Sequence, residues 1–198
     1  MHWWPADTAF EVIIGAILTQ NTAWRNVALA ITNLKAAGVI TPAGVNALAP
    51  DKLAQLIKPS GYYNIKAQRL QAFTRFLQDE FSGSMDALAA GDLEELRGKL
   101  LRVRGIGPET ADSILLYACE KPIFVVDAYT KRILSRHGIV PTTADYAALQ
   151  NLFMKNLPPR VGLYNQYHAL LVNTGKIFCT PKQEHCGDCP LHNMPDHS

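Results

Sequence analysis

Apolar residues recur along most of this chain with a period of three to four positions, which indicates helices. Between Phe10 and Leu18 they follow one helix face, behind a Thr8-x-x-Glu11 capping box. Other helix starts are predicted at about Thr22, Thr41–Pro42, Pro50, Asn64, Asp92, Pro108, Asp127, Thr143 and Arg160. The strongest strand candidate, residues 122–126, is interpreted as a short buried connector. We therefore expect an all-α fold.

Composition changes this picture little. The chain has 198 residues, 48% hydrophobic and 18% charged, which is typical of a globular protein. A net charge of +2 does not itself indicate nucleic acid. Between Arg97 and Arg136, however, eight Lys or Arg residues face four Asp or Glu residues. This local excess suits a phosphate backbone, and it is equally compatible with a solvated helix face.

The sequence also bears on location. It contains no apolar run long enough to span a membrane and no recognisable secretory signal. We expect a cytoplasmic protein, acting at the bacterial nucleoid. In a reducing compartment clustered cysteines indicate metal ligands rather than disulfides, and here Cys179, Cys186 and Cys189 cluster while Cys119 stands alone.

A glycine-rich turn, Val103-Arg104-Gly105-Ile106-Gly107-Pro108, separates two predicted helices. Its two glycines permit positive φ and a close backbone approach, and Ile106 is expected to pack inward. Pro108 opens the second helix, whose first N–H groups attract a phosphate oxygen. Alone, such a turn is often only a connection. The helix start and the later Asp127 favour a phosphate-binding hairpin.

Four motifs follow one another along the chain: Leu18-Thr19-Gln20-Asn21, Gly61-Tyr62-Tyr63-Asn64-x-Lys66-Ala67, the hairpin, and Val126-Asp127. Together they resemble the helix-hairpin-helix (HhH-GPD) DNA glycosylase superfamily that includes endonuclease III. The resemblance implies two helical lobes, one of about residues 20–130 and one of about 1–19 plus 131–178, with a cysteine loop at 179–195. It also implies a DNA-binding cleft, a nucleotide flipped out of the duplex, and possible binding of an alkali-metal ion at the hairpin.

In this superfamily Asp127 matches the catalytic carboxylate. A fixed carboxylate can stabilise the positive charge that builds on the sugar, or orient water. The plain alternative, that Asp127 caps the following helix, is compatible with this role. Glu109 stands where strand-cleaving members carry a lysine. Glutamate cannot form a Schiff base, so we expect no lyase step. Lys131 is the nearest substitute amine.

Aromatic residues suggest a branch of the superfamily. Trp3-Trp4-Pro5, the run from Gln20 to Trp24, and the hairpin's second helix as far as Cys119 resemble 3-methyladenine DNA glycosylase III. Aromatic faces can select a positively charged alkylated purine by stacking and cation–π attraction. The alternative is that the tryptophans are hydrophobic anchors. The predicted base pocket comprises Trp3, Trp4, Pro5, Trp24, Glu109 and Lys131.

The DNA contacts expected from the resemblance are Gln20, Asn21, Gly61, Tyr62, Arg104, Gly105, Ile106 and Gly107. Gln20 matches a polar residue that fills the space left by a flipped base, and Tyr62 matches a wedge between base steps. Without DNA, Tyr62 would be an ordinary aromatic residue of a surface loop.

The cysteines reproduce part of a cluster motif. Cys179-x₆-Cys186-x₂-Cys189 matches three ligands of the [4Fe–4S] loop of endonuclease III relatives, and Pro195 occupies the fourth position. His192 or His197 could complete the site. The alternative is a degenerate loop that binds nothing, as in 3-methyladenine glycosylase III.

The leading prediction is a monomeric, monofunctional glycosylase that removes alkylated purines from double-stranded DNA and leaves an abasic site. Two alternatives stay open. One is an endonuclease III-like or adenine glycosylase-like enzyme for oxidised or mismatched bases, and the other is a lesion-binding protein with little catalysis.

Overall fold

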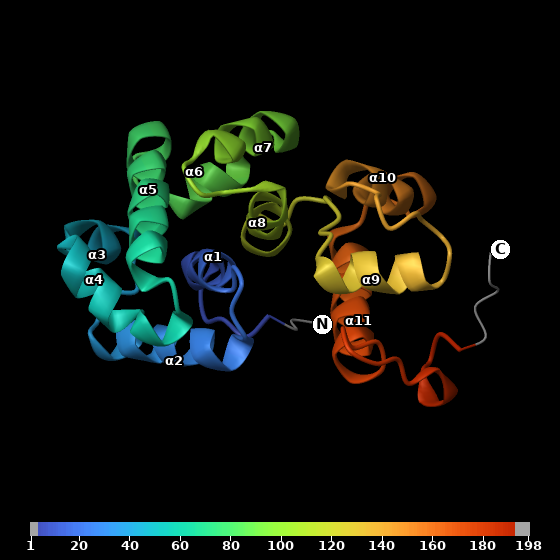
Figure 1. Cartoon of the computed structure of the whole chain (residues 1–198). Helices are drawn as coiled ribbons and strands as arrows, with labels where there is room; N and C mark the ends of the chain where they lie inside the picture. Colours follow the sequence, from blue (N-terminus) through green and yellow to red (C-terminus); the bar gives the residue numbers. More distant parts are fainter. Residues whose placement is uncertain (1–3, 193–198) are drawn as a thin grey trace. The chain divides into compact units, whose positions relative to one another are not determined.

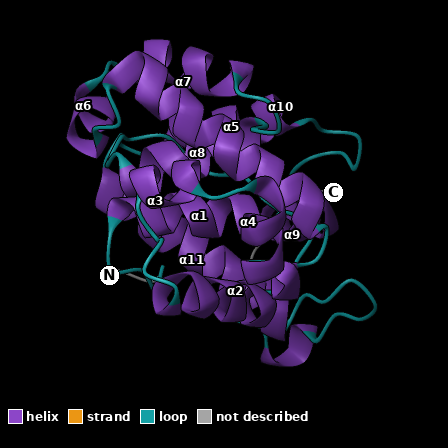
Figure 2. Ribbon diagram, turned by 90° about the vertical axis from the view of Figure 1, so that its left-hand side faces the viewer, coloured by secondary structure: helices purple, strands orange, loops and turns teal. Residues whose placement is uncertain are grey.

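The computed structural model describes residues 4–192 and shows only helices and loops there, without a strand (Figure 2). The all-α prediction is therefore confirmed. The α-helices are α1 (Ala9–Leu18), α2 (Trp24–Ala36), α3 (Pro42–Ala47), α4 (Pro50–Leu56), α5 (Tyr63–Phe81), α6 (Met85–Ala90), α7 (Leu93–Arg102), α8 (Pro108–Ser113), α9 (Ala128–Arg136), α10 (Tyr146–Asn156) and α11 (Val161–Ile177). Among these described residues no helix is long and apolar enough to cross a membrane.

The described chain divides into two compact units. Residues 4–121 form what we call the hairpin unit, and residues 122–192 belong to the aspartate unit. This division differs from the predicted lobes, which assigned residues 1–19 to the second lobe. The reason is that α1 packs on α2, α5 and α8, all within the hairpin unit.

Helix α1 is the central helix of the hairpin unit (Figure 1). Its residues from Phe10 to Leu18 are all buried, including those between the apolar positions of the sequence pattern. Around it lie α2, α5 and α8, and α5 in turn carries α3, α4 and α6. The hairpin is thus built on a well-packed scaffold.

Four of the predicted helix starts are confirmed by side-chain capping bonds, those at Thr8, Thr41, Asp92 and Asp127. The hydroxyl of Thr8 accepts a hydrogen bond from the Glu11 N–H, and Asp92 caps α7 by accepting from two N–H groups. Two predictions were wrong. Helix α5 begins at Tyr63 rather than being capped by Asn64, and α10 is capped by Asp145 rather than starting near Thr143. Helix α6 was not predicted, because six residues are too few to establish a period.

In the aspartate unit, residues 122–126 form the expected connector, and positions 123–126 are buried. The ring of Phe124 stacks on Phe153 at 3.9 Å between centroids, and Tyr164 meets its edge at 5.5 Å. Helices α9 and α11 pack closely where Gly175 lies against Tyr129, since a Cβ there would lie 2.6 Å from the ring. This packing fixes the helix that Asp127 opens.

Candidate functional site

The hairpin joins the end of α7 to the start of α8. Gly105 has φ +88°, which a residue with a Cβ rarely adopts, and Ile106 is buried as predicted. The expectation of a positive φ is not met at Gly107, because its φ of −94° is ordinary extended backbone. Helix α8 continues as a π-helical segment, Ile114–Ala118. The first N–H groups of α8 thus lie beside the turn, where a phosphate oxygen can accept from them.

Three chain segments meet at Gly105. A Cβ on this glycine would lie within 2.7 Å of the Arg69 Cδ, so the arginine stem lies directly on the turn. Arg69 also donates to the Gln20 Oε1. The Gln20 Nε2 in turn donates to the Gly105 carbonyl at 3.0 Å and to the Thr110 hydroxyl at 2.9 Å. Sequence reasoning missed Arg69, because its partners are far away along the chain.

The other residues expected to contact DNA lie on two loops with unusual backbone. Asn21 is exposed with φ +53°, and Tyr62 is 70% exposed with φ +46°, next to Gly61 with φ +64°. Asparagine tolerates such angles, whereas a bulky residue such as Tyr62 adopts them only when its surroundings hold it there. Tyr62 is therefore a large aromatic side chain held out into solvent.

The structure brings two of the predicted pocket tryptophans together. Trp4 meets Trp24 edge to face, with 5.5 Å between ring centroids. Tyr117 lies on Trp4, with ring centroids 5.2 Å apart. The Trp4 ring can lie on α1 because Gly15 has no Cβ, which would come within 3.1 Å of Trp4 Nε1. Tyr117, which belongs to the π-helical segment, is an additional member of this aromatic cluster.

The remaining pocket candidates are less closely associated. Pro5 is exposed, and Glu109 is exposed in the first turn of α8. Lys131 belongs to the aspartate unit, where its Nζ donates to the Ala144 carbonyl at 2.8 Å. Trp3 lies outside the described residues. Membership of these four in a base pocket stays a prediction.

The predicted basic patch is smaller than its composition suggested. Arg97 forms a bidentate ion pair with the buried Asp112, with N–O distances of 2.7 and 3.1 Å. Lys99 pairs with Glu80 and Glu95 at 3.2 and 3.0 Å. Several of these cations therefore stabilise the fold, and Arg102 and Arg104 remain exposed near the hairpin.

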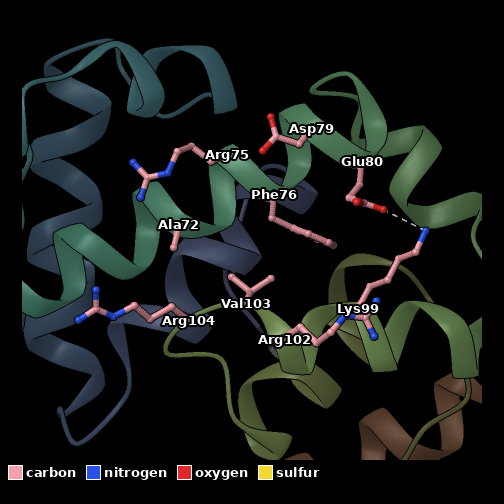
Figure 3. Close-up of a pocket in the computed structure, with 9 residues that line it drawn as sticks. All are labelled: Ala72, Arg75, Phe76, Asp79, Glu80, Lys99, Arg102, Val103 and Arg104. Atoms are coloured by element: carbon pink, nitrogen blue, oxygen red, sulfur yellow. Dashed lines mark ion pairs between the residues drawn. The ribbon is translucent and has the colours of Figure 1, made fainter.

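A surface cavity of about 410 Å³ adjoins the hairpin unit's exposed arginines (Figure 3). Arg75 and Arg104 extend toward the same side in this view, with Ala72 between them, and Phe76 points to the other side; Ala72, Phe76 and Val103 supply the apolar part of the lining. Neither Trp4 nor Trp24 lines this cavity. It is distinct from the aromatic cluster and has the mixed, charged lining of a surface groove.

Asp127 is held firmly in the aspartate unit. Its Oδ1 caps α9 by accepting from the Thr130 N–H at 2.8 Å, and it also accepts from the Thr130 hydroxyl at 2.9 Å. Its Oδ2 lies 3.4 Å from Nε2 of His168, a buried residue of α11. Asp127 therefore caps α9 and is held in a fixed position at the same time, as the sequence suggested. Its contact with His168 was not predicted.

The surroundings of Asp127 favour its charged form. Burial raises the pKa of the carboxyl group, but the hydrogen bond and charge of His168, together with the Thr130 donors, outweigh burial and lower the pKa below its usual value. Asp127 is consequently a carboxylate at neutral pH. An oriented negative charge that is largely shielded from solvent is suited to stabilising a cationic sugar.

Two arginines of α9 hold the cysteine loop. Arg132 donates to the Cys179 carbonyl at 2.7 Å and to the Gly175 carbonyl at 3.1 Å. Arg136 donates to the Cys179 Sγ at 3.2 Å and to the Thr180 carbonyl at 2.8 Å. The start of the loop is thus fixed by guanidinium groups.

The described side chains do not fit a complete [4Fe–4S] site, which needs four ligands. Cys179 is buried, Cys186 is exposed and Cys189 is half-buried, and within residues 4–192 no three His, Cys, Asp or Glu side chains gather as a metal site. His192 is exposed, while Pro195 and His197 lie outside the described residues. Cys119 is buried, and burial raises its pKa to about 11.

Comparisons with known proteins agree with this geometry. Residues 14–159 match the family described as HhH-GPD superfamily base excision DNA repair protein. The chain is 46% identical over 192 residues to the protein named "Putative DNA repair glycosylase MJ1434" of Methanocaldococcus jannaschii, covering 96% of this chain and 86% of the relative. It is 32% identical over 184 residues to endonuclease III of Thermotoga maritima, covering 93% and 81%.

Among solved structures, the chain is similar to H. pylori 3-methyladenine DNA glycosylase (MagIII) bound to 1,N6-ethenoadenine. The TM-score is 0.77 at 31% identity, with 88% of each chain covered. A non-covalent endonuclease III–DNA complex has a TM-score of 0.81 at 23% identity, covering 95% of this chain and 83% of that one, which supports the fold. The chain belongs to the HhH-GPD superfamily and is a DNA glycosylase of base excision repair.

Proposed function

We propose that this glycosylase removes alkylated purines from double-stranded DNA by hydrolysis and leaves an abasic site without cutting the strand. The observation that carries the proposal is the cluster of Trp4, Trp24 and Tyr117. The similarity to MagIII bound to 1,N6-ethenoadenine, at 31% identity, supports a modified purine as the ligand.

The aromatic cluster suits such a base for electrostatic reasons. A purine alkylated on a ring nitrogen carries positive charge, and the face of an indole attracts a cation. The same charge makes the base a good leaving group, so little help from a general acid is required. The positive charge of the lesion thus explains both why the pocket selects this base and why the base leaves easily.

Asp127 would supply the remaining chemistry. As the bond between base and sugar breaks, positive charge develops on the sugar, and the ionised carboxylate stabilises it. The two Thr130 donors bind Oδ1, and Oδ2, which lies 3.4 Å from His168 Nε2, keeps a lone pair that can orient the attacking water. The water adds its oxygen to the sugar carbon and gives one proton to the Asp127 carboxylate, and the cationic base leaves as a neutral base with the bonding electrons.

The absence of a lyase step follows from Glu109. Strand cleavage in this superfamily needs an amine that attacks the sugar and forms a Schiff base, and a carboxylate cannot do so. The nearest amine in sequence, Lys131, donates to the Ala144 carbonyl. Borohydride should therefore trap no covalent complex between the wild-type protein and DNA.

The test is an excision assay on duplexes carrying 3-methyladenine, 7-methylguanine, 1,N6-ethenoadenine, oxidised pyrimidines or adenine opposite 8-oxoguanine. Each product is divided and analysed with and without alkali. We expect breaks only after alkali, and only with alkylated purines. Breaks without alkali would refute the monofunctional assignment, and preferred excision of oxidised or mismatched bases would refute the substrate class.

A pair of variants tests the aromatic cluster itself. We expect Trp24→Leu to lower kcat/KM for a cationic purine by roughly 2- to 30-fold, since cation–π contacts contribute about 0.5–2 kcal/mol. Phe76→Leu is the matched control, because Phe76 is an aromatic residue of the same unit that contacts Phe81 instead. Equal losses in the two variants would contradict a base-binding role.

A further inference from the structure

Lys66 is the most deeply buried cation of the hairpin unit that the proposed chemistry does not use. It lies on α5 with only 1% of its surface exposed. Burial, and secondarily the charge of Arg69, lowers its pKa to about 8. At neutral pH the amine is therefore mostly protonated and carries three N–H donors. A buried charge of this kind is costly unless every donor finds a partner.

Each of the three donors has a partner close by. The Lys66 Nζ lies 2.7 Å from the Leu18 carbonyl, 2.6 Å from the Thr22 hydroxyl and 2.8 Å from the Ser60 carbonyl. The Thr22 hydroxyl also lies 2.6 Å from the Ser60 carbonyl. One ammonium group and one hydroxyl thus link the segment after α1 to the segment before α5.

The linked segments are the two loops whose residues have positive φ angles. Leu18 and Thr22 bracket Asn21, which has φ +53°, and Ser60 precedes Gly61 and Tyr62 with φ +64° and +46°. Conformations of this kind relax when the contacts that hold them are lost. The Lys66 bonds end on residues next to both loops, at Leu18, Thr22 and Ser60.

We propose that Lys66 is a positioning residue that holds the Gln20–Asn21 loop and the Gly61–Tyr62 loop in one fixed arrangement, so that both enter the duplex as a unit. The inference rests on the proposed function, because it takes these loops to act in opening the base pair. A wedge props a base step apart and a filling residue occupies the vacated space, so the two act on the same step only if their loops keep a fixed relative placement.

The consequence is specific to paired DNA. Extruding a paired base costs a few kcal/mol, and this cost is smallest for a base that is already unpaired. Loosened loops should therefore impair excision from a duplex much more than excision from an unpaired bubble. A general loss of stability would impair both substrates equally.

The experiment compares the intact protein with Lys66→Met, at matched concentrations of folded protein. The lesion is a 3-methyladenine or 1,N6-ethenoadenine placed either in a full duplex or in a short unpaired bubble. We expect kcat/KM to fall about 10- to 100-fold on the duplex and only about threefold on the bubble. Equal losses on both substrates, or full activity on both, would overturn the proposal.

Two further variants keep the test decisive. Thr22→Val removes the hydroxyl link at lower cost than a lost ammonium, and we expect the same substrate bias if Lys66→Met does not fold. Gln71→Met is the matched control, because Gln71 is a buried polar residue of α5 whose Nε2 donates to the Leu48 carbonyl at 2.9 Å, away from both loops. We expect no bias from this variant.

A binding measurement separates this inference from the proposed function. A duplex with a tetrahydrofuran abasic analogue needs no excision, so its Kd reports binding without chemistry, and the comparison between variants isolates the share of the loops. We expect Lys66→Met to weaken binding to this duplex about 10-fold relative to Gln71→Met. If wild-type protein excised none of the lesions, the proposed function would fail, and the Kd values would still decide the role of Lys66.

Discussion

The hairpin and the surroundings of Asp127 are built in opposite ways. The hairpin depends on backbone: Gly105 turns the chain at φ +88°, and the first N–H groups of α8 face the turn. Asp127 depends on side chains, because Thr130 and His168 orient its carboxylate and determine its charge. In the function proposed above, one region would provide affinity for a phosphate and the other would provide reactivity.

This difference predicts different consequences of mutation. A site that depends on its backbone angles is disrupted when a turn glycine is replaced by a residue with a Cβ. Such a substitution changes DNA binding and stability. A site that depends on side chains is disrupted when a hydrogen-bonding partner is replaced. Such a substitution changes the excision rate and its pH dependence, while the fold persists. The two kinds of failure can be measured separately in one protein.

The largest expected effect is that of Asp127→Asn. Asparagine caps helices as well as aspartate does, so α9 should remain intact, while the negative charge facing the sugar is lost. We expect kcat to fall by roughly 10³-fold with an unchanged Kd for duplex DNA. Single-turnover excision and fluorescence anisotropy measure the two quantities. Full activity in this variant would remove Asp127 from the mechanism.

The next largest effect is expected from Gly105→Ala. The variant requires a Cβ at φ +88° and within 2.7 Å of the Arg69 Cδ. We expect it to lower the free energy of unfolding by about 1–3 kcal/mol and to weaken DNA binding. Chemical denaturation measures the first effect.

Gly107→Ala is the matched control for the hairpin. Gly107 has φ −94°, and no atom lies within 4 Å of a Cβ placed there. Its free energy of unfolding should change by less than about 0.5 kcal/mol. If both alanines destabilised the protein equally, the hairpin would not depend on the backbone angle of Gly105.

A smaller effect is expected from His168→Gln. The charge of His168 lowers the pKa of Asp127, so removing it should raise that pKa toward its ordinary value. Because the carboxylate is the active form, the acid limb of the kcat/KM profile should move to higher pH. At neutral pH we expect a loss of about tenfold, corresponding to one hydrogen bond to a charged group.

Thr174→Val is the control for this effect, because Thr174 is a buried polar residue of the same helix without a contact to Asp127. Its pH profile should match that of the wild type. An acid limb that stayed in place in His168→Gln would show that Thr130 alone sets the charge of the carboxylate.

The same contrast explains what the sequence could predict. The hairpin consists of neighbouring residues, so its turn, the inward Ile106 and the start of α8 could all be inferred from local pattern. The exception is Gly107, whose ordinary backbone angle cannot be distinguished in sequence from that of Gly105. At Gly107 the space that a Cβ would occupy is open, whereas at Gly105 it is taken by Arg69.

Long-range partners could not be predicted. His168 lies far along the chain from Asp127, and a histidine on an apolar helix carries no signal of its partner. Arg69 and Tyr117 are likewise defined by contacts with Gln20 and Trp4 that only folding creates. Counting charges also misled, because Arg97 and Arg132 serve internal contacts rather than a surface patch.

The smallest expected effect on activity comes from Arg136→Met, at the opposite end of the helix that Asp127 caps. Arg136 donates to the Cys179 sulfur and to the Thr180 carbonyl, and it holds the cysteine loop without touching the carboxylate. We expect hydrogen exchange at residues 179–189 to accelerate, while kcat changes by less than about threefold. If kcat instead fell as far as in His168→Gln, the loop and the aspartate would be coupled through α9. The chemistry would then depend on more than the side chains that contact Asp127, and the contrast between the two regions would have to extend to the whole helix.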